Sequence, residues 1–296
     1  MTAGARPRRP LASVVMPTYN KRDRLRAVLE AFALTPQGFP FEVVVTDDGS
    51  TDGTGAWLAS CRLPFPLQVV RGTHRGAAAA RNQAAAQARG SWFVFSDDDM
   101  VPQRGFIAAH VRRLQADPGW LYRGRRWAIP VDEVPAWLAE PVTPAALDRL
   151  WGKARMTVGE ARARRALALP VHHAYRFAHT CTSNLSVSAG VFGALGGFDE
   201  RFGTGWGGED TDLGYRAEQR GWRLADAPDA VNCHLEHSRS SAEKFRRGLP
   251  NFRYLAAKHR DRGVAALVSY LESVVALGFS EDLFNEQEFV CEGDAP

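Results

Sequence analysis

The sequence predicts an α/β fold with a Rossmann-like, mostly parallel central sheet flanked by helices. In the first third of the chain, short apolar runs alternate with longer helical segments. The apolar runs are continuous, which is typical of parallel strands that are covered on both faces. Polar turns follow three of these runs, and ligands of parallel sheets bind beyond the carboxyl ends of the strands. We therefore expect a ligand site along one edge of the sheet.

The first half of the chain supplies four expected strands and the helices between them. The strands are expected over residues 11–16, 41–46, 67–70 and 92–96. The helices are expected over residues 21–34, through Trp57 and Leu58, and over residues 76–89 and 106–114. In the first helix, Leu25, Val28, Leu29 and Phe32 recur at helical spacing, which favours one buried face.

Residues 120–168 differ from the rest, since they carry four tryptophans, several prolines and an arginine-rich stretch. We interpret them as a mainly helical insertion whose tryptophans either pack a small core of its own or line a substrate groove. Regular structure resumes at residues 180–188, whose alternation suits a half-buried strand. The remaining elements are expected to be helices over residues 189–195 and 209–219, strands over 223–227 and 229–234, and a helical tail over 240–277.

Composition excludes several classes of protein. Hydrophobic content of 45% and charged content of 24% are ordinary for a soluble globular protein. No apolar run reaches the roughly 18 residues that span a bilayer, and no apolar segment follows the basic N-terminus as in a secretory signal. Four scattered cysteines indicate reduced thiols. We expect a cytoplasmic protein without a transmembrane segment.

The formal net charge is only +4, and only four of the 37 basic residues are lysines. Basic clusters at residues 6–9, 162–165 and 244–247 are interpreted as solvated faces, with peripheral contact to an anionic membrane surface or a phosphorylated ligand as the alternative. No nucleic-acid-binding module accompanies them, so we expect no nucleic acid partner.

Three consecutive carboxylates, Asp97, Asp98 and Asp99, end an expected buried strand. Like charges at this spacing repel unless a cation neutralises them. Carboxylate oxygens suit Mg²⁺ or Mn²⁺, which keep part of their shell for phosphates, although a solvated acidic turn is the commoner explanation. Asp47 and Asp48 end a neighbouring strand, where a carboxylate can accept a hydrogen bond from a uracil ring or a ribose hydroxyl.

A second acidic group, Glu209, Asp210 and Asp212, begins an expected helix after a glycine-rich loop around Trp206. Carboxylates in the first turn of a helix interact favourably with its dipole, so these residues can be simple caps. A carboxylate in this position can also act as a general base.

Four segments, SVVMPTYNK, VVVTDDGSTDGT, GAAAARNQAAAQARG and FSDDDMVP, closely resemble the N-terminal half of family 2 glycosyltransferases. Those enzymes have the GT-A fold and use nucleotide-diphosphate sugars. The later segment that contains GWGGEDTDL looks like the galactosyltransferase-type segment of β1,4-galactosyltransferases. Together the resembling segments cover about half of the chain.

The resemblance implies roles for individual residues. Contacts to the nucleotide are implied for Pro17, Thr18, Tyr19, Asp48 (at the uracil edge) and Arg81. Asp97 and Asp99 would form the DxD motif for ribose and metal, with Asp98 between them and Asp99 as the metal ligand. The implied cofactor is Mn²⁺ or Mg²⁺, and the implied donor is a UDP-sugar.

On the acceptor side, the resemblance makes Asp210 the general base, with Glu209 as the alternative base or acceptor ligand. Trp206 would offer an aromatic face to a sugar ring. His234, or His237 three residues later, would complete the metal site.

We divide the chain into a nucleotide-sugar-binding half (1–118), the insertion (119–178), an acceptor and catalytic half (179–239) and a helical extension (240–296). The predicted function is an inverting, metal-dependent transfer of a sugar from a UDP-sugar to an acceptor. A sugar nucleotidyltransferase is an alternative, although the first turn lacks that class's glycine-rich loop; a non-catalytic nucleotide-sugar-binding partner is another. The acceptor, whether saccharide, lipid-linked, protein or small molecule, stays open, as does the donor sugar.

Overall fold

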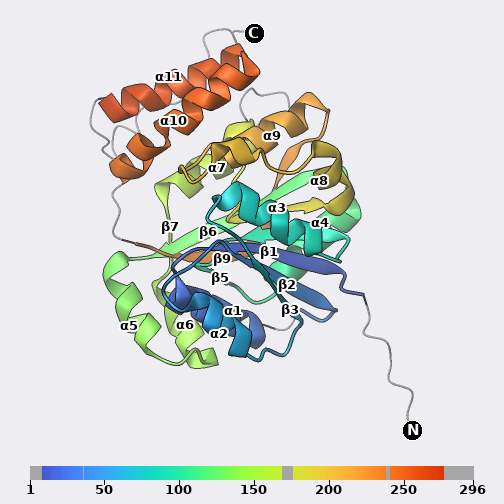
Figure 1. The fold of residues 1–296 in the computed structure, drawn as a ribbon, viewed down its shortest axis with the longest axis vertical. Helices are drawn as coiled ribbons and strands as arrows, with labels where there is room; N and C mark the ends of the chain where they lie inside the picture. Colours follow the sequence, from blue (N-terminus) through green and yellow to red (C-terminus); the bar gives the residue numbers. More distant parts are fainter. Residues whose placement is uncertain (1–8, 36, 169–175, 238–240, 277–296) are drawn as a thin grey trace.

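A nine-stranded sheet with helices on both faces forms the centre of the molecule (Figure 1). The computed structural model describes residues 9–35, 37–168, 176–237 and 241–276. The strand order is β3-β2-β1-β4-β8-β6-β9-β5, and β7 pairs with β6 outside this path. Half of the sheet therefore follows the chain order of a Rossmann-like unit, and the other half mixes strands that are distant in sequence.

The N-terminal unit is parallel, as predicted. Its strands β1 (Ala12–Thr18), β2 (Phe41–Asp47), β3 (Leu67–Arg71) and β4 (Trp92–Ser96) run in one direction. The connecting helices are α1 (Arg22–Leu34), α2 (Thr54–Ser60) and α3 (Ala77–Gln87). The central positions of β1 and β2 are fully buried on both faces, which explains their continuous runs of valine.

The second half of the sheet is mixed. Strand β8 (Asn184–Ser188) is antiparallel to β4, and β6 (Leu121–Ile129) lies between β8 and β9 (Leu224–Leu235). The short β5 (Met100–Pro102) pairs with the end of β9 and places Met100 opposite His234. This pairing brings the acidic end of β4 against a histidine more than 130 residues later in the chain.

Three expectations about strands need correction. The segment interpreted as a helical insertion begins with β6, a strand in the middle of the sheet. The arginines of β6 made this strand difficult to predict from the sequence. Buried Arg123 is neutralised by Glu160 of helix α7 (Val158–Ala168) instead of being solvated. The two strands expected over 223–234 are one strand, β9, whose register with β6 shifts between Gly124 and Arg125. Strand β8 was expected to be half-buried, but residues 184–187 are buried on both faces.

Elsewhere in that segment, the described residues form several helices, the two-residue strand β7 (Arg155–Met156) and short connections. Its helices are η1 (Val131–Glu133), α5 (Val134–Ala139), α6 (Pro144–Lys153), α7 (Val158–Ala168) and η2 (Arg176–His179). Trp137 is buried in the core beneath the sheet, where Trp127 and Trp151 also pack. These tryptophans therefore support the fold, but they pack in the main core together with α1 and α4 rather than in a separate core of the segment.

Two hydrophobic layers cover the sheet. One layer contains α1, α4 (Phe106–Ala116), α5 and α6, and the other contains α3, α8 (Ala189–Leu195) and α9 (Glu209–Gln219). The short η3 (Glu200–Phe202) precedes α9. The helices α10 (Ser241–His259) and α11 (Arg262–Ala276) pack against α9, η2 and η3 at one end of the molecule (Figure 1). Within the described residues, no helix combines the length and apolar character that a membrane span requires.

Asn184 joins three strands beneath the edge of the sheet where the acidic turns lie. Its side-chain amide donates to the carbonyls of Arg125 and Ala230 and to Asn232 Oδ1, at 3.0 to 3.1 Å. Its Oδ1 lies 2.8 Å from Nε2 of His110, whose pKa burial lowers to about 4, so the neutral ring donates this bond. A Cβ at Gly124 would overlap Asn184, so glycine is required at this close approach.

We expect Asn184→Ala to lower the free energy of unfolding by about 2 to 4 kcal/mol, because it leaves buried carbonyls and the His110 ring without partners. Urea unfolding at constant pH measures the loss. Ser186→Ala on the same strand is the matched control, since the buried Ser186 hydroxyl has no hydrogen-bond partner among the described residues. An Asn184→Ala protein as stable as this control would contradict the role assigned to the amide.

Candidate functional site

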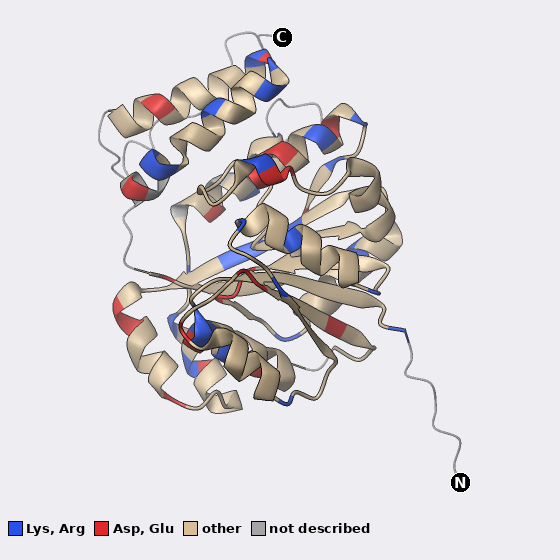
Figure 2. Ribbon diagram, in the orientation of Figure 1, with Lys and Arg blue, Asp and Glu red and all other residues tan. Residues whose placement is uncertain are grey.

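Acidic residues gather where the carboxyl ends of β1, β2 and β4 meet the start of α9 (Figure 2). The turns after these strands place Asp48 beside Thr18, whose carbonyl accepts the Asp48 backbone N–H at 2.9 Å. Thr18 in turn donates its hydroxyl to Asp98 Oδ2 at 2.7 Å. The acidic turns therefore share one connected site, as the parallel topology predicted.

Each residue of the acidic triplet has a basic partner. Asp97 Oδ1 accepts a hydrogen bond from Arg81 at 2.8 Å. Lys21 Nζ lies 2.7 Å from Asp99 Oδ2 and 3.3 Å from Asp98 Oδ1. Asp98 and Asp99 are 4% and 3% exposed, so without these cations their mutual repulsion would be poorly screened. The sequence analysis did not identify Lys21 as a site residue. Its position, four residues after Pro17 of the first strand and so close to the expected ligand edge, could have indicated it.

The two buried carboxylates differ in pKa. Burial raises the pKa of Asp98 to about 6, opposed by Lys21 and reinforced by the charge of Asp99. Burial acts in the same sense on Asp99, but Lys21 and His234 outweigh it and hold its pKa well below the ordinary value. Burial opposes the charge of Lys21, yet the carboxylates of Asp98 and Asp99 raise its pKa above the ordinary value. Asp99 and Lys21 are therefore charged at neutral pH.

Asp99, His234 and His237 form a cluster that could hold a metal ion. One ligand atom from each lies within 4.8 Å of the other two. Both histidines face the same carboxylate oxygen, with Nε2 of His234 at 3.5 Å and Nε2 of His237 at 3.8 Å from Asp99 Oδ2. Glu236 lies 3.1 Å from Nδ1 of His234, a contact that orients the ring so that Nε2 points to Asp99.

The turn after β2 is held by its own carboxylates. Asp48 accepts the backbone N–H groups of Arg75 at 3.0 Å and Gly76 at 2.8 Å, and so ties the loop before α3 to the end of β2. Tyr19, at 40% exposure, stacks on His74 of this loop with ring centroids 4.1 Å apart. Pro17 is the last residue but one of β1. A direct contact of Pro17, Thr18, Tyr19 or Asp48 with a base stays a prediction.

Arg81 connects the two acidic groups. Its guanidinium donates to Asp97 at the end of β4 and, at 2.9 Å, to Glu209 in the first turn of α9. It also lies over the ring of Phe198, 5.7 Å from the centroid. Burial would lower its pKa, but Asp97 and Glu209 raise it above the ordinary value. Arg81 was predicted to face the nucleotide; the structure shows that its guanidinium pairs with two carboxylates at the site.

Asp210 is the carboxylate of the site whose pKa lies near neutrality. Burial and the neighbouring charge of Glu209 raise its pKa to about 7, against the opposing effect of Arg81. Its Oδ1 accepts the backbone N–H of Thr211 at 2.8 Å, which fixes the side chain at the start of the helix. The residue keeps part of its surface accessible to solvent, as proton exchange with a bound molecule requires.

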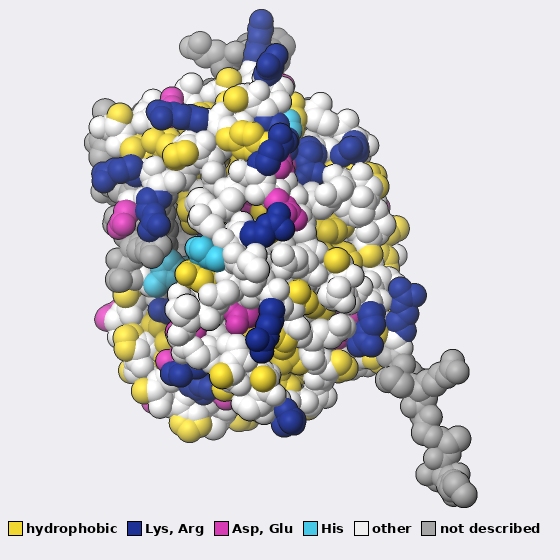
Figure 3. All heavy atoms as spheres, viewed as in Figure 1, with side chains coloured by type: hydrophobic (Ala, Val, Ile, Leu, Met, Phe, Trp, Pro, Cys, Tyr) yellow, Lys and Arg dark blue, Asp and Glu magenta, His cyan; other side chains and the backbone are white. Residues whose placement is uncertain are grey.

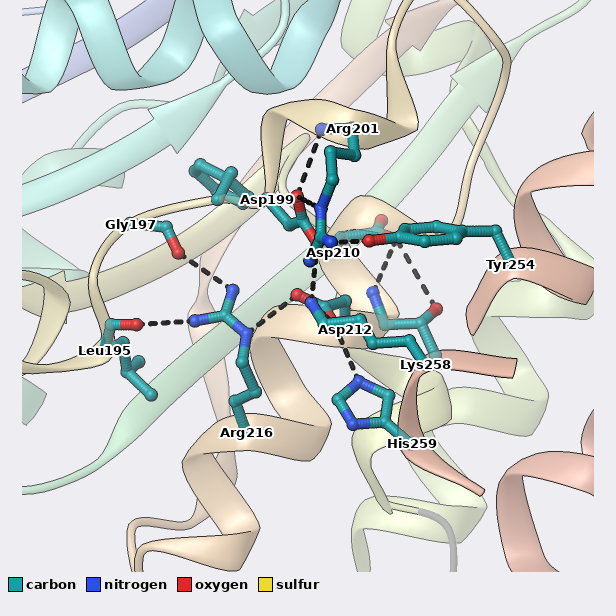
Figure 4. Close-up of polar contacts among 12 residues, drawn as sticks. Leu195, Gly197, Asp199, Arg201, Asp210, Asp212, Arg216, Tyr254, Lys258 and His259 are labelled. Carbon is teal, nitrogen blue, oxygen red and sulfur yellow. Dashed lines mark hydrogen bonds and ion pairs between the residues drawn. The ribbon is translucent and has the colours of Figure 1, made fainter. Parts of the chain in front are cut away.

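Asp212 anchors the C-terminal helices to α9 (Figure 4). This fully buried carboxylate accepts hydrogen bonds from Arg216 at 2.7 Å and from Lys258, and lies 2.7 Å from Nε2 of His259. Lys258 also donates to Asp199, at 2.8 Å. Asp212, which the sequence suggested could be a simple cap, thus links α10 to the helix that carries Asp210.

Trp206 lies on the glycine-rich loop before α9 and is 44% exposed. Its ring packs edge to face against Phe245 and Phe252 of α10, with centroids 5.4 and 6.4 Å apart. In the space-filling view, histidine side chains are exposed on the face that is shown, and acidic and basic side chains are scattered over the same face (Figure 3). Trp206 therefore packs against α10 and keeps part of its ring exposed, and its contact with a sugar ring stays a prediction.

The comparisons with known proteins agree with this geometry. The sequence profile described as "Glycosyl transferase family 2" matches residues 13–177, more than half of the chain. The profile described as "N-terminal domain of galactosyltransferase" matches residues 163–238. Both predicted resemblances are confirmed.

A validoxylamine A glucosyltransferase of Streptomyces hygroscopicus subsp. limoneus is 33% identical over 259 residues, which cover 80% of this chain and 54% of the relative. The aligned regions make up 30% to 58% of the length of the first three curated relatives, so this chain spans about half of their length or less.

Two solved structures share the fold at low sequence identity. A mannosyltransferase from Pyrobaculum calidifontis, in complex with GDP-Man and Mn²⁺, has a TM-score of 0.59 and 22% identity, covering 91% of this chain and 71% of that one. Residues 1–349 of S. aureus TarS, in complex with UDP-GlcNAc, have a TM-score of 0.58 and 14% identity, covering 94% and 76%. With these matches and the site assembled at its strand ends, the chain belongs to glycosyl transferase family 2, a family of glycosyltransferases, and has the GT-A fold.

Proposed function

We propose that the protein is an inverting, metal-dependent glycosyltransferase that moves a sugar from a UDP-sugar to an acceptor hydroxyl. The observation that carries this proposal is that Arg81 connects the acidic turn after β4 to the start of α9, so that two groups of functional side chains belong to one site. One is the Asp99, His234 and His237 cluster, and the other is Asp210, a carboxylate with a pKa raised to about 7. A single displacement needs one metal site and one base, and these residues supply a candidate for each.

The chemistry of the cluster fits a divalent cation. One carboxylate oxygen and two imidazole nitrogens form a mixed donor set that Mn²⁺ accepts, and Glu236 orients one of the rings. When bound, the ion would supply positive charge to the leaving diphosphate. The Mn²⁺ in the neighbouring mannosyltransferase structure supports this choice of metal.

The choice between Asp210 and Glu209 as the base follows from their partners. Glu209 is 9% exposed, and its carboxylate accepts a hydrogen bond from Arg81 at 2.9 Å, so it is already engaged by a fixed cation. Among the described residues, Asp210 accepts hydrogen bonds only from its neighbour Thr211, and its pKa is raised to about 7. We assign Asp210 as the base that takes the acceptor's proton while the acceptor oxygen bonds to the anomeric carbon and the sugar–diphosphate bond breaks. Glu209 holds Arg81 in place.

On the donor side, the exposed ring of Tyr19, stacked on His74, offers a surface for a uracil ring. Asp48 shapes that surface through its bonds to the loop before α3. Among donor sugars, the name of the relative puts UDP-glucose first for testing, and the bound ligands of the neighbours add UDP-GlcNAc and GDP-mannose. The family match favours this reaction over a nucleotidyltransferase.

Nucleotide release during incubation of the protein with each donor, with and without Mn²⁺, tests the proposed function. Metal-dependent UDP release that increases with an acceptor is the expected result. A protein that binds UDP yet releases none from any donor or acceptor would be the non-catalytic partner instead.

Asp210→Asn should reduce kcat by roughly 10²- to 10⁴-fold, because the amide cannot accept the acceptor's proton. The binding of UDP and Mn²⁺, measured by calorimetry, should stay within about twofold, because Asp210 lies outside the metal cluster. Glu209→Gln is the matched comparison. If Glu209→Gln loses turnover while Asp210→Asn keeps it, the assignment of the base is reversed.

The rate should fall as the pH decreases through about 7, since Asp210 acts only when deprotonated and its pKa is raised to about 7. One pH unit below this pKa, roughly one-tenth of the carboxylate remains ionised. Single-turnover rates with saturating donor and Mn²⁺ over pH 5.5 to 8.5 measure this limb. A rate independent of pH across the range would exclude Asp210 as the base.

Asp99→Ala should abolish detectable Mn²⁺ binding, and His234→Ala should weaken it more than His237→Ala does. The reason is that Glu236 orients His234, which lies 3.5 Å from Asp99 Oδ2 against 3.8 Å for His237. Calorimetric titration of Mn²⁺ in the presence of UDP gives the affinities. A loss confined to His237→Ala would make His237 the principal nitrogen ligand.

A further inference from the structure

Lys21 provides the cation that the buried acidic turn requires in the ligand-free protein. It immediately precedes α1, and its ammonium bridges Asp99 Oδ2 at 2.7 Å and Asp98 Oδ1 at 3.3 Å. The side chain of Asp98 is 6% exposed and that of Asp99 is 4% exposed, whereas that of Lys21 is 33% exposed. The positive charge therefore reaches the acidic turn from the solvent side.

The ammonium and the expected metal use the same oxygen. Asp99 Oδ2 is the atom that accepts from Lys21, and it is also the atom that both His234 and His237 face. Two cations within a few ångströms of one another repel, most strongly where solvent is scarce. A divalent ion between Asp99 and the histidines would therefore weaken or replace the contact with Lys21.

The side chain of Lys21 is less firmly held in place than that of Arg81. Arg81 is 4% exposed, pairs with Asp97 and Glu209, and lies over Phe198, so its position is fixed by packing. Within the part of the chain that the structure describes, the ammonium of Lys21 forms hydrogen bonds or ion pairs only with Asp98 and Asp99. A four-carbon stem with one partly exposed face can rotate toward the open side of the site.

We propose that Lys21 is a resident counter-cation that competes with the divalent ion for Asp99 and, once displaced, pairs with the diphosphate of the nucleotide. This inference rests on the proposed function of the site. Its consequence is positive coupling: metal binding frees an ammonium for the diphosphate, and the diphosphate gives that ammonium a new anionic partner. Lys21 thereby disfavours metal binding without a nucleotide and favours it with one.

Calorimetric titration of Mn²⁺ into the ligand-free protein tests the competition. Lys21→Met removes the ammonium and keeps the apolar stem, so Mn²⁺ should bind about tenfold more tightly than to the unmodified protein. Lys21→Arg keeps the positive charge and can bridge both carboxylates, so its affinity should be no higher than that of the unmodified protein. Arg22→Met is the matched control, because it removes a neighbouring positive charge that pairs with exposed Asp23; it should change the affinity less than twofold.

The same titrations in saturating UDP test the coupling. UDP should increase the Mn²⁺ affinity of the unmodified protein by a factor about tenfold larger than in Lys21→Met, because only the unmodified protein regains a partner for the ammonium. Thermal melting of each variant without ligand confirms that the folded protein is being titrated. If Lys21→Met does not fold, the comparison of Lys21→Gln with Lys21→Arg decides the question in the same way.

Two negative results are distinguishable. If Lys21→Met binds Mn²⁺ no more tightly than the Arg22→Met control while Asp99→Ala abolishes binding, the metal site stands and the competition proposed for Lys21 is wrong. If Asp99→Ala leaves Mn²⁺ binding unchanged, the metal site itself is wrong, and the proposed function loses its metal.

Discussion

Neutralisation of the carboxylates that end β4 is the interaction on which the site depends. Asp97, Asp98 and Asp99 follow a buried strand, and two of them are almost inaccessible to water. Carboxylates that are so poorly solvated must be paired, because solvent cannot screen their repulsion. Their partners come from three separate elements: Lys21 before α1, Arg81 on α3 and His234 on β9. Charge balance therefore requires the N-terminal unit and the last strand to meet at one point.

The parallel half of this arrangement could be predicted because its signals are local. Continuous valine runs in β1 and β2, helical spacing in α1 and acidic turns after the strands all lie within short windows of sequence. The helix that carries Glu209 and Asp210 begins and ends where the sequence indicated. The grouping of Asp99 with His234 and His237 was expected only through family resemblance; the structure supplies its physical cause, the pairing of β5 with β9.

The remaining features depend on partners that a sequence window does not contain. Strand β6 has arginines where a buried strand usually has apolar residues, and it is stable inside the sheet because Glu160, from a helix 37 residues later, neutralises Arg123. Asn184 resembles any polar residue at the start of a strand, yet its amide holds the register shift between β6 and β9. Lys21 resembles an exposed helix start. In each case tertiary pairing, rather than local pattern, decides the position of the charge or amide.

Arg81 joins the acidic turn after β4 to the start of α9 through one buried cation. Its two carboxylate partners belong to different halves of the chain, Asp97 to the end of β4 and Glu209 to the start of α9. The negative charge that Arg81 holds at Glu209 is one of the causes, after burial, of the raised pKa of Asp210. The pKa of the proposed base therefore depends on a cation that also pairs with Asp97 of the acidic turn. The network of hydrogen bonds around Asp212 holds α9 in place (Figure 4). A rearrangement at Asp97 would therefore change the pKa of Asp210 through electrostatics alone, without movement of α9.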